Sequence, residues 1–250
     1  MKTIGPAFFM CVLLHTTGFA FQRSPAAEEN LTKGRAILQK TIAATGGSEK
    51  FAKINNFRIK TASKIFGQQT TLELTVTETV EFPDKTRQFF ELAAGQRIQV
   101  LDGNVGWKKS GGTVTDLTEA ERREMKRGLF RDTINLFKRV ENDGLRTEYF
   151  GEEIVGGDTL FVVHIKDKTG EFFNVYVNAR TFLIEKKSYQ GGPEALLATL
   201  QEIYSDYRDV QGVKIPFHTV VTANGKKFIE SRVLEVMFNV ELSNDFFLKE

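Results

Sequence analysis

The feature that most constrains this chain is an alternation of apolar and polar residues with a period of two. Between residues 57 and 65 the odd positions are Phe, Ile, Thr, Ser and Ile, whereas Arg58, Lys60 and Lys64 occupy even positions. This pattern is typical of a β-strand with one buried face. The same alternation returns in residues 72–82.

Further short segments of this kind follow, separated by turn sequences such as Asp102-Gly103-Asn104 and Asn224-Gly225. The segments predicted as strands are 87–92, 97–101, 105–109, 147–154, 160–166, 171–177, 183–189, 197–207, 214–222 and 226–238. Short strands joined by tight turns favour an antiparallel sheet over a βαβ arrangement. The fold class predicted is therefore mainly β, with a minor α content.

One clear helix interrupts the strands, between residues 118 and 137. Thr118 and Glu121 form a capping box, in which each side chain satisfies a free backbone donor of the other. Its apolar stripe consists of Met125, Leu129, Phe130, Ile134 and Phe137, and charged residues cover the opposite face. We expect this helix to cover an apolar surface of the sheet, although a helix lying on a membrane would show the same pattern.

Helical spacing is also found near the start of the chain, where Leu31, Leu38 and Ile42 recur before Gly46-Gly47. Ser48 can cap a second short helix that extends to Ile54. The folded domain is predicted to span residues 30–250. Residues 21–29 contain Ser24-Pro25 and no periodic pattern, so we expect a flexible leader there.

Residues 1–20 have the organisation of a secretory signal peptide, with Lys2, an apolar run and a Gly18-Phe19-Ala20 cleavage site. The apolar run is too short for a membrane-spanning helix, which needs roughly 20 residues. Cleavage after Ala20 predicts an exported, soluble periplasmic protein. It would also remove Cys11, the only cysteine, and with it any disulfide or thiolate ligand.

Composition excludes some classes of function. The formal net charge is only +2, and charges of both signs are interspersed, so nothing favours nucleic-acid binding. Phenylalanine is abundant, with 22 copies against five tyrosines and one tryptophan. Most aromatic surface therefore carries no polar group and suits a core or an apolar pocket.

No sequence motif indicates catalysis, a metal or a cofactor. Nucleophile-elbow, phosphate-loop and dinucleotide-binding motifs are absent, and His164 and His218 have no metal-ligand spacing. We therefore expect a protein that is not an enzyme. A hydrolase in which Ser63, Ser188 or Ser231 meets one of these histidines stays an alternative hypothesis.

Several short segments, mostly at turns, carry a resemblance to a known family. They are residues 43–47 (AATGG), 102–107 (DGNVGW), 153–158 (EIVGGD), 206–216 (DYRDVQGVKIP) and 239–243 (NVELS). With them the chain resembles the periplasmic lipoprotein-carrier superfamily, comprising LolA-like, LolB-like and outer-membrane lipoprotein-sorting proteins. The resemblance implies an unclosed β-barrel, a strongly curved antiparallel sheet whose concave face is covered by helices.

The resemblance further implies a chaperone-like carrier that holds lipid or the acyl chains of lipoproteins and exchanges them with donor and acceptor proteins at membranes. A monomer is expected. The helix at residues 118–137 would be the lid of the ligand pocket. The alternative function is an envelope-stress sensory domain of the same architecture, in which the sheet docks a protein partner.

Candidate ligand-binding residues are the apolar members of the alternating strands together with the helix stripe. They are Leu74, Val76, Phe89, Trp107, Leu129, Phe130, Ile134, Phe137, Phe161 and Val163. Plain core packing is the competing interpretation for each of them. No catalytic residue, metal ligand or cofactor is predicted.

Overall fold

The computed structural model describes residues 25–140, 144–191 and 198–250. The predicted signal peptide, residues 1–20, lies outside the described residues. Within these described ranges, thirteen strands form a single sheet in the order β6-β5-β4-β3-β2-β1-β13-β12-β11-β10-β9-β8-β7. All of the pairings are antiparallel, as the turn-rich pattern predicts.

The strands of the first half are β1 (Asn56–Phe66), β2 (Thr71–Glu81), β3 (Lys85–Leu92), β4 (Gly95–Asp102), β5 (Val105–Ser110) and β6 (Thr113–Asp116). Those of the second half are β7 (Arg146–Val155), β8 (Asp158–Lys166), β9 (Phe172–Asn178), β10 (Ile184–Gly191), β11 (Ala198–Val210), β12 (Val213–Ala223) and β13 (Lys226–Phe238). Only β6 was not predicted from the sequence. The first and last strands, β1 and β13, pair in the middle of the sheet and join the two halves.

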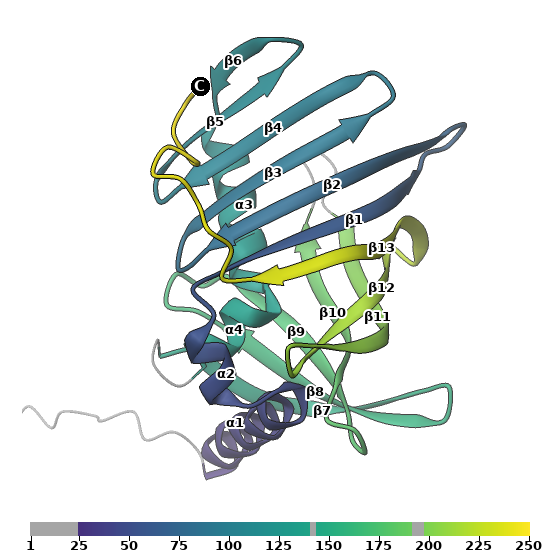
Figure 1. The fold of residues 1–250 in the computed structure, drawn as a ribbon. Coiled ribbons are helices and arrows are strands. Elements are labelled where there is room, and N and C mark those ends of the chain that lie inside the picture. Colours follow the sequence, from purple (N-terminus) through teal and green to yellow (C-terminus); the bar gives the residue numbers. More distant parts are fainter. Residues whose placement is uncertain (1–24, 141–143, 192–197) are drawn as a thin grey trace, which may run out of the picture.

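The sheet is strongly curved and does not close into a barrel (Figure 1). Its two edge strands, β6 and β7, are consecutive in the chain, and the segment between them contains helices α3 (Glu119–Arg131) and α4 (Thr133–Arg139). These helices lie inside the curve of the sheet, so they cover its concave face. The chain thus places these two helices between the edges that a closed barrel would have to pair.

Helix α1 runs from Pro25 to Thr45 and packs mainly on β7, and the short α2 (Ser48–Lys53) contacts α4. Residues 25–29 are therefore helical, although the sequence suggested a flexible leader there. Proline at a helix start followed by Ala and Glu is a favourable beginning. Gly34 is required where α1 crosses β7, because a Cβ at this position would lie 2.7 Å from the backbone nitrogen of Tyr149.

The long helix predicted over residues 118–137 is in fact two helices. The capping box of Thr118 and Glu121 is confirmed at the start of α3. Asp132 ends α3 and caps α4, since its carboxylate accepts a hydrogen bond from the backbone N–H of Asn135 at 2.7 Å. Aspartate is a strong helix N-cap, so a new helix begins here and the chain changes direction.

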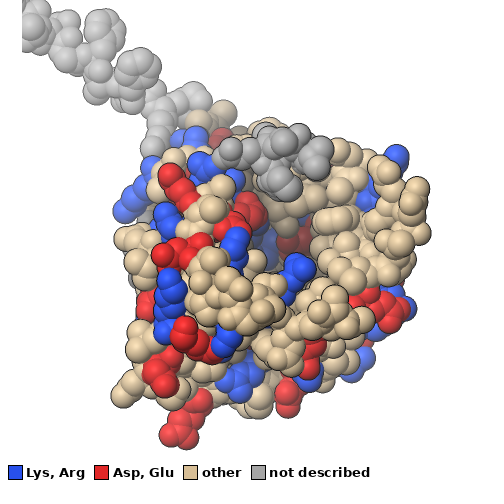
Figure 2. All heavy atoms as spheres, turned by 90° about the horizontal axis from the view of Figure 1, so that it is seen from above, with Lys and Arg blue, Asp and Glu red and all other residues tan. Residues whose placement is uncertain are grey.

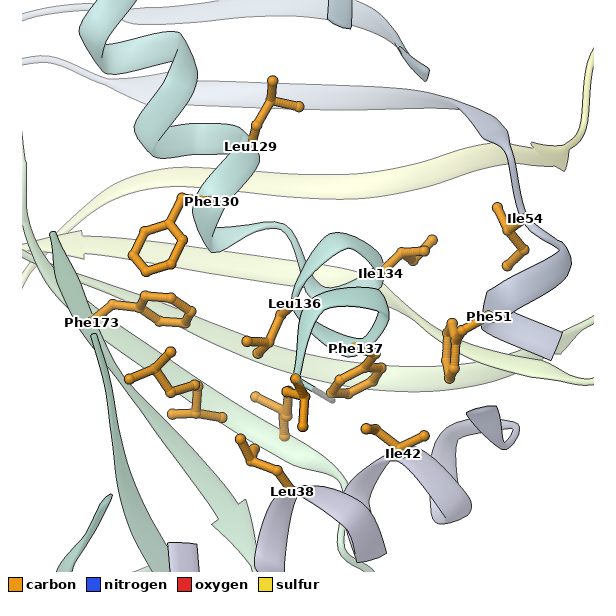
Figure 3. Close-up of a cluster of buried hydrophobic side chains, with 14 of the residues drawn as sticks. Leu38, Ile42, Phe51, Ile54, Leu129, Phe130, Ile134, Leu136, Phe137 and Phe173 are labelled. Atoms are coloured by element: carbon orange, nitrogen blue, oxygen red, sulfur yellow. The ribbon is translucent and has the colours of Figure 1, made fainter. Parts of the chain in front are cut away.

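The main hydrophobic core fills one end of the concave face, between the sheet and helices α1, α2 and α4 (Figure 3). Leu38 of α1, Leu136 of α4 and Val163 of β8 are completely inaccessible to solvent. Phe51 and Phe137 meet edge to face with their centroids 5.1 Å apart, as do Phe130 and Phe173. This end of the curve is therefore closely packed, with a cavity of only 30 Å³ beside Phe51 and Phe137.

Candidate functional site

A cavity of 340 Å³ remains at the other end of the concave face, beside the junction of α3 and α4. Figure 2 looks at the molecule from this end and shows a hollow with basic and acidic atoms visible inside it. The volume lies within the ~300–1,000 Å³ range of small-molecule sites. We call this cavity the hollow.

Apolar side chains from both halves of the sheet and from the helices line the hollow. They are Ile59 of β1, Val80 of β2, Leu129 of α3, Ile134 of α4, Ile215 and Pro216 of β12, and Val233 of β13. These elements bring the two ends of the chain together with its middle. The site therefore forms only when strands from both halves of the sheet have come together.

The floor of the hollow is polar, and Lys187 of β10 is its central group. Its ammonium donates hydrogen bonds to the backbone carbonyl of Arg131 at 2.5 Å and to Thr133 Oγ1 at 2.7 Å. The side chain is buried, and burial lowers the pKa of Lys187. Lys187 therefore ties the α3–α4 junction to the sheet.

Asp132 lies in the same network. Burial raises the pKa of Asp132 to about 6. The hydrogen bond from the backbone of Asn135 and the positive charge of Lys187 act in the opposite direction and lower this pKa. The charge of Glu78, across the hollow, raises the pKa further. A carboxyl with a pKa near neutrality in a cleft is a feature often found at functional sites.

Glu202 of β11 accepts hydrogen bonds from two tyrosines, Tyr189 at 2.5 Å and Tyr204. Burial, followed by the charge of Glu202, raises the pKa of both phenols, so both remain protonated donors. The guanidinium of Arg131 stacks on the ring of Tyr189, 3.9 Å from its centroid. These contacts hold the side chain of Glu202 in place at the hollow.

The predicted site residues are distributed over several environments. Leu129 and Ile134 line the hollow. Leu74 and Val76 lie on the concave face of β2, because they are separated by even numbers of residues from Glu78 and Val80, which line the hollow. Of these four residues, the hollow brings together Leu129 and Ile134, and Leu74 and Val76 are not among its lining residues.

Four others belong to the packed end of the curve. Phe130, Phe137 and Val163 are buried in the main core, where their neighbours are side chains of the protein itself. Phe161 packs at the margin of that core, with its ring between Tyr149 and Phe182. Their contacts match the interpretation as core residues.

Phe89 and Trp107 lie on the opposite, convex face of the sheet. Phe89 pairs with Ile98. Trp107 pairs with Val100, and these two belong to a second small core. This core is covered by the C-terminal segment. Phe247 packs there and its carbonyl accepts a hydrogen bond from Trp107 Nε1 at 3.0 Å.

His164 and His218 are on the convex face as well. His164 forms a hydrogen bond with Asn174, in which His164 Nδ1 lies 2.8 Å from Asn174 Oδ1. His218 lies between Ser205 and Glu230, at 2.9 Å and 2.8 Å, which is the order of groups in a hydrolase triad. None of these residues lines the hollow, and Ser205 is exposed on a strand. The serines named from the sequence do not contact either histidine: Ser63 pairs with Ser231, and Ser188 with Tyr176.

Within the described residues, no group of three or more His, Cys, Asp or Glu side chains is placed to hold a metal ion. Among the helices described, none is both long and apolar enough to cross a membrane.

The polar floor was not predicted from the sequence. Its members are Glu78, Arg131, Asp132, Lys187 and Glu202, which come from strands and helices far apart in the chain. One usable signal was Asp132 itself, a residue type that favours the N-cap position of a helix, inside the predicted helix. Lys187, in the sequence Glu185-Lys186-Lys187, reads as part of a solvated face.

The sequence matches no protein-family model, and no curated protein is similar to it. Solved structures are similar in fold. A LolA superfamily protein from Nitrosomonas europaea has 12% identity and a TM-score of 0.59, covering 86% of this chain and 97% of its own. A putative outer membrane lipoprotein-sorting protein domain from Vibrio parahaemolyticus has 12% identity and a TM-score of 0.57, with 88% and 97% covered.

A DUF1329 family protein from Desulfovibrio piger is similar to the same extent, with 11% identity, a TM-score of 0.60 and coverage of 87% and 97%. The protein therefore belongs to the class of folds in which an open, curved antiparallel sheet surrounds a hollow. More particularly, the chain has the LolA-like fold, which confirms the fold expected from the sequence resemblance.

Proposed function

We propose that this protein is a periplasmic, non-catalytic binding or carrier protein for a lipid or a lipid-modified polypeptide. The observation that carries the proposal is the hollow, a 340 Å³ cavity with apolar walls from β1, β2, β12, β13 and the helices. The structures with the same fold include a putative lipoprotein-sorting domain, which supports a cargo of this chemical kind.

The energetics of burial agree with such a cargo. Transfer of one acyl CH₂ group from water to an apolar site contributes roughly 0.8 kcal/mol. A chain that buries several such groups between Leu129, Ile134 and Val233 can therefore bind without a dedicated polar contact along its length. We place Leu74 and Val76 on the path of such a chain, toward the open rim of β2.

The test compares two variants on the same strand. Val233 lines the hollow, whereas its neighbour Leu234 is 56% exposed. Val233→Phe should reduce the hollow, and Leu234→Phe should leave it unchanged. Native mass spectrometry of protein purified from a bacterial envelope should show bound lipid on the wild type and on Leu234→Phe, and a clear loss on Val233→Phe. Wild-type protein without lipid, or equal occupancy of both variants, would contradict the proposal.

A second candidate is an interaction domain that docks a protein partner. Large apolar side chains are exposed on and near β7, where Phe150 is 75% and Ile154 77% exposed, and Phe172 of β9 is 49% exposed. Apolar side chains exposed together often mark an interaction surface. In the same experiment, an empty hollow together with loss of a stoichiometric partner on Phe150→Ser would favour this candidate.

A further inference from the structure

The hollow is lined by more acidic than basic side chains, and these side chains differ in how far other groups of the protein already bind them. Three carboxylates, Glu78, Asp132 and Glu202, face two cations, Arg131 and Lys187. A hollow suited only to hydrocarbon would need none of them, because burying a charged group carries a large desolvation cost. The floor therefore has the composition of a binding site for a polar group.

The two cations are already engaged by the protein. Lys187 directs its ammonium at Arg131 O and Thr133 Oγ1. Arg131 donates to Glu124 Oε1 at 2.8 Å and stacks on Tyr189. An anionic ligand group would therefore have to compete with these contacts for its donors.

Glu78, by contrast, offers an acceptor to the hollow. Its Oε1 receives hydrogen bonds from Thr86 Oγ1 at 3.1 Å and Gln88 Nε2 at 2.9 Å. No side chain of the described residues donates to its Oε2. A carboxylate oxygen accepts hydrogen bonds and repels anions at short range. It therefore favours a ligand group that donates hydrogen bonds.

Apolar side chains flank the hollow on the concave face of strands on both of its sides. The alternation along β2 and β3 places Val76 and Phe90, which pair with each other, on the same face as Glu78 and Gln88. On the opposite wall, Leu200 and Val221 share the face of Glu202, with Val221 its direct partner. A polar group at the floor and an apolar chain toward the rim is therefore the orientation that matches the lining.

We propose that the floor of the hollow binds the hydrogen-bond-donating, non-anionic end of an amphiphilic ligand, an ammonium group above all, with Glu78 as its acceptor. The inference rests on the proposed function, since it specifies the polar end of the ligand whose chain the hollow takes. It excludes fatty acids and phosphate-ended amphiphiles as preferred ligands.

The probes are dodecylammonium and dodecanoate, which share a chain and differ in the charge of the head. Titration calorimetry at neutral pH, below the micelle concentration, should show dodecylammonium bound at least about tenfold more tightly than dodecanoate, equivalent to about 1.4 kcal/mol. Glu78→Gln keeps the shape and removes the charge, so it should bring the ratio of the two affinities close to one.

Glu91→Gln is the matched control. Glu91 lies on the convex face of the neighbouring strand, where it pairs with Lys60, so its loss should leave the ratio unchanged. Equal binding of both probes, tighter binding of dodecanoate, or the same loss of preference in both variants would overturn the inference while leaving lipid binding intact. Failure of both probes to bind would overturn the inference and the proposed function together.

Discussion

Asp132 should make the stability of this protein decrease as pH rises from about 4 to about 6. Its pKa is raised in the folded state from an ordinary value of 3.8 to about 6. The folded protein therefore holds this proton more tightly than the unfolded chain. Stability from this source is fully present below pH 3.8 and is lost as pH rises through the folded value.

The size of the effect follows from the shift. About two pKa units at 1.36 kcal/mol each give ~3 kcal/mol. Asp132→Asn removes the ionisation but preserves an N-cap, because asparagine caps helices about as well as aspartate. Relative to wild type, Asp132→Asn should thus have nearly equal stability at pH 4 and a free energy of unfolding higher by up to ~3 kcal/mol above pH 7.

Urea unfolding of both proteins across this pH range measures the difference directly, because contributions from other groups cancel. Asp206→Asn serves as a control with the opposite sign. The hydrogen bond and charge of Arg208 lower the pKa of Asp206, so that group favours folding above pH 3.8 and loses this contribution in acid. A difference between Asp132→Asn and wild type that does not change with pH would refute the reasoning about the buried carboxyl.

Three further predictions concern packing. Leu136→Ala, at a fully buried position of α4, should reduce the free energy of unfolding by about 2–5 kcal/mol in urea titrations; a loss under 1 kcal/mol would contradict the solid core. Gly34→Ala should cost about 1–3 kcal/mol, because its Cβ meets the backbone of Tyr149, and protection of α1 amides against hydrogen exchange should fall. Phe247→Ala should shift the fluorescence of the single tryptophan, Trp107, to longer wavelength as the C-terminal segment loosens, whereas Leu248→Ala, at a 58% exposed side chain, should not.

Strand identity could be predicted from local pattern because each strand carries its own alternation. The one strand missed, β6, has only four residues, Thr113 to Asp116, and three of them are polar. The break at Asp132 was hidden for a related reason. Leu129 and Ile134 both face the concave side, so the apolar stripe continues across the junction although the helix does not.

Which face of a strand borders the hollow could not be read from alternation alone. Strands β3 to β5 have covered residues on both faces, because α3 lies over one and the C-terminal segment over the other. Phe89 and Trp107 are apolar positions of alternating strands, as Leu74 and Val76 are, but they lie on the convex face of the sheet. The pattern predicts that a side chain is buried without indicating which segment buries it.

The division of the concave face into a packed end and an open end explains how the fold can carry a polar floor. Removing water from Lys187 and its acidic neighbours costs free energy that an apolar floor would not, since well-packed hydrophobic groups often replace buried ion pairs without loss of stability. Burial of Leu38, Leu136 and Phe173 at the packed end offsets that cost. Because the two ends share strands β10 to β12, the packed end also holds the strands that position Lys187 and Glu202. Rigid support beside an unfilled hollow is the arrangement that lets a site distinguish the polar end of a ligand, and not only accept its chain.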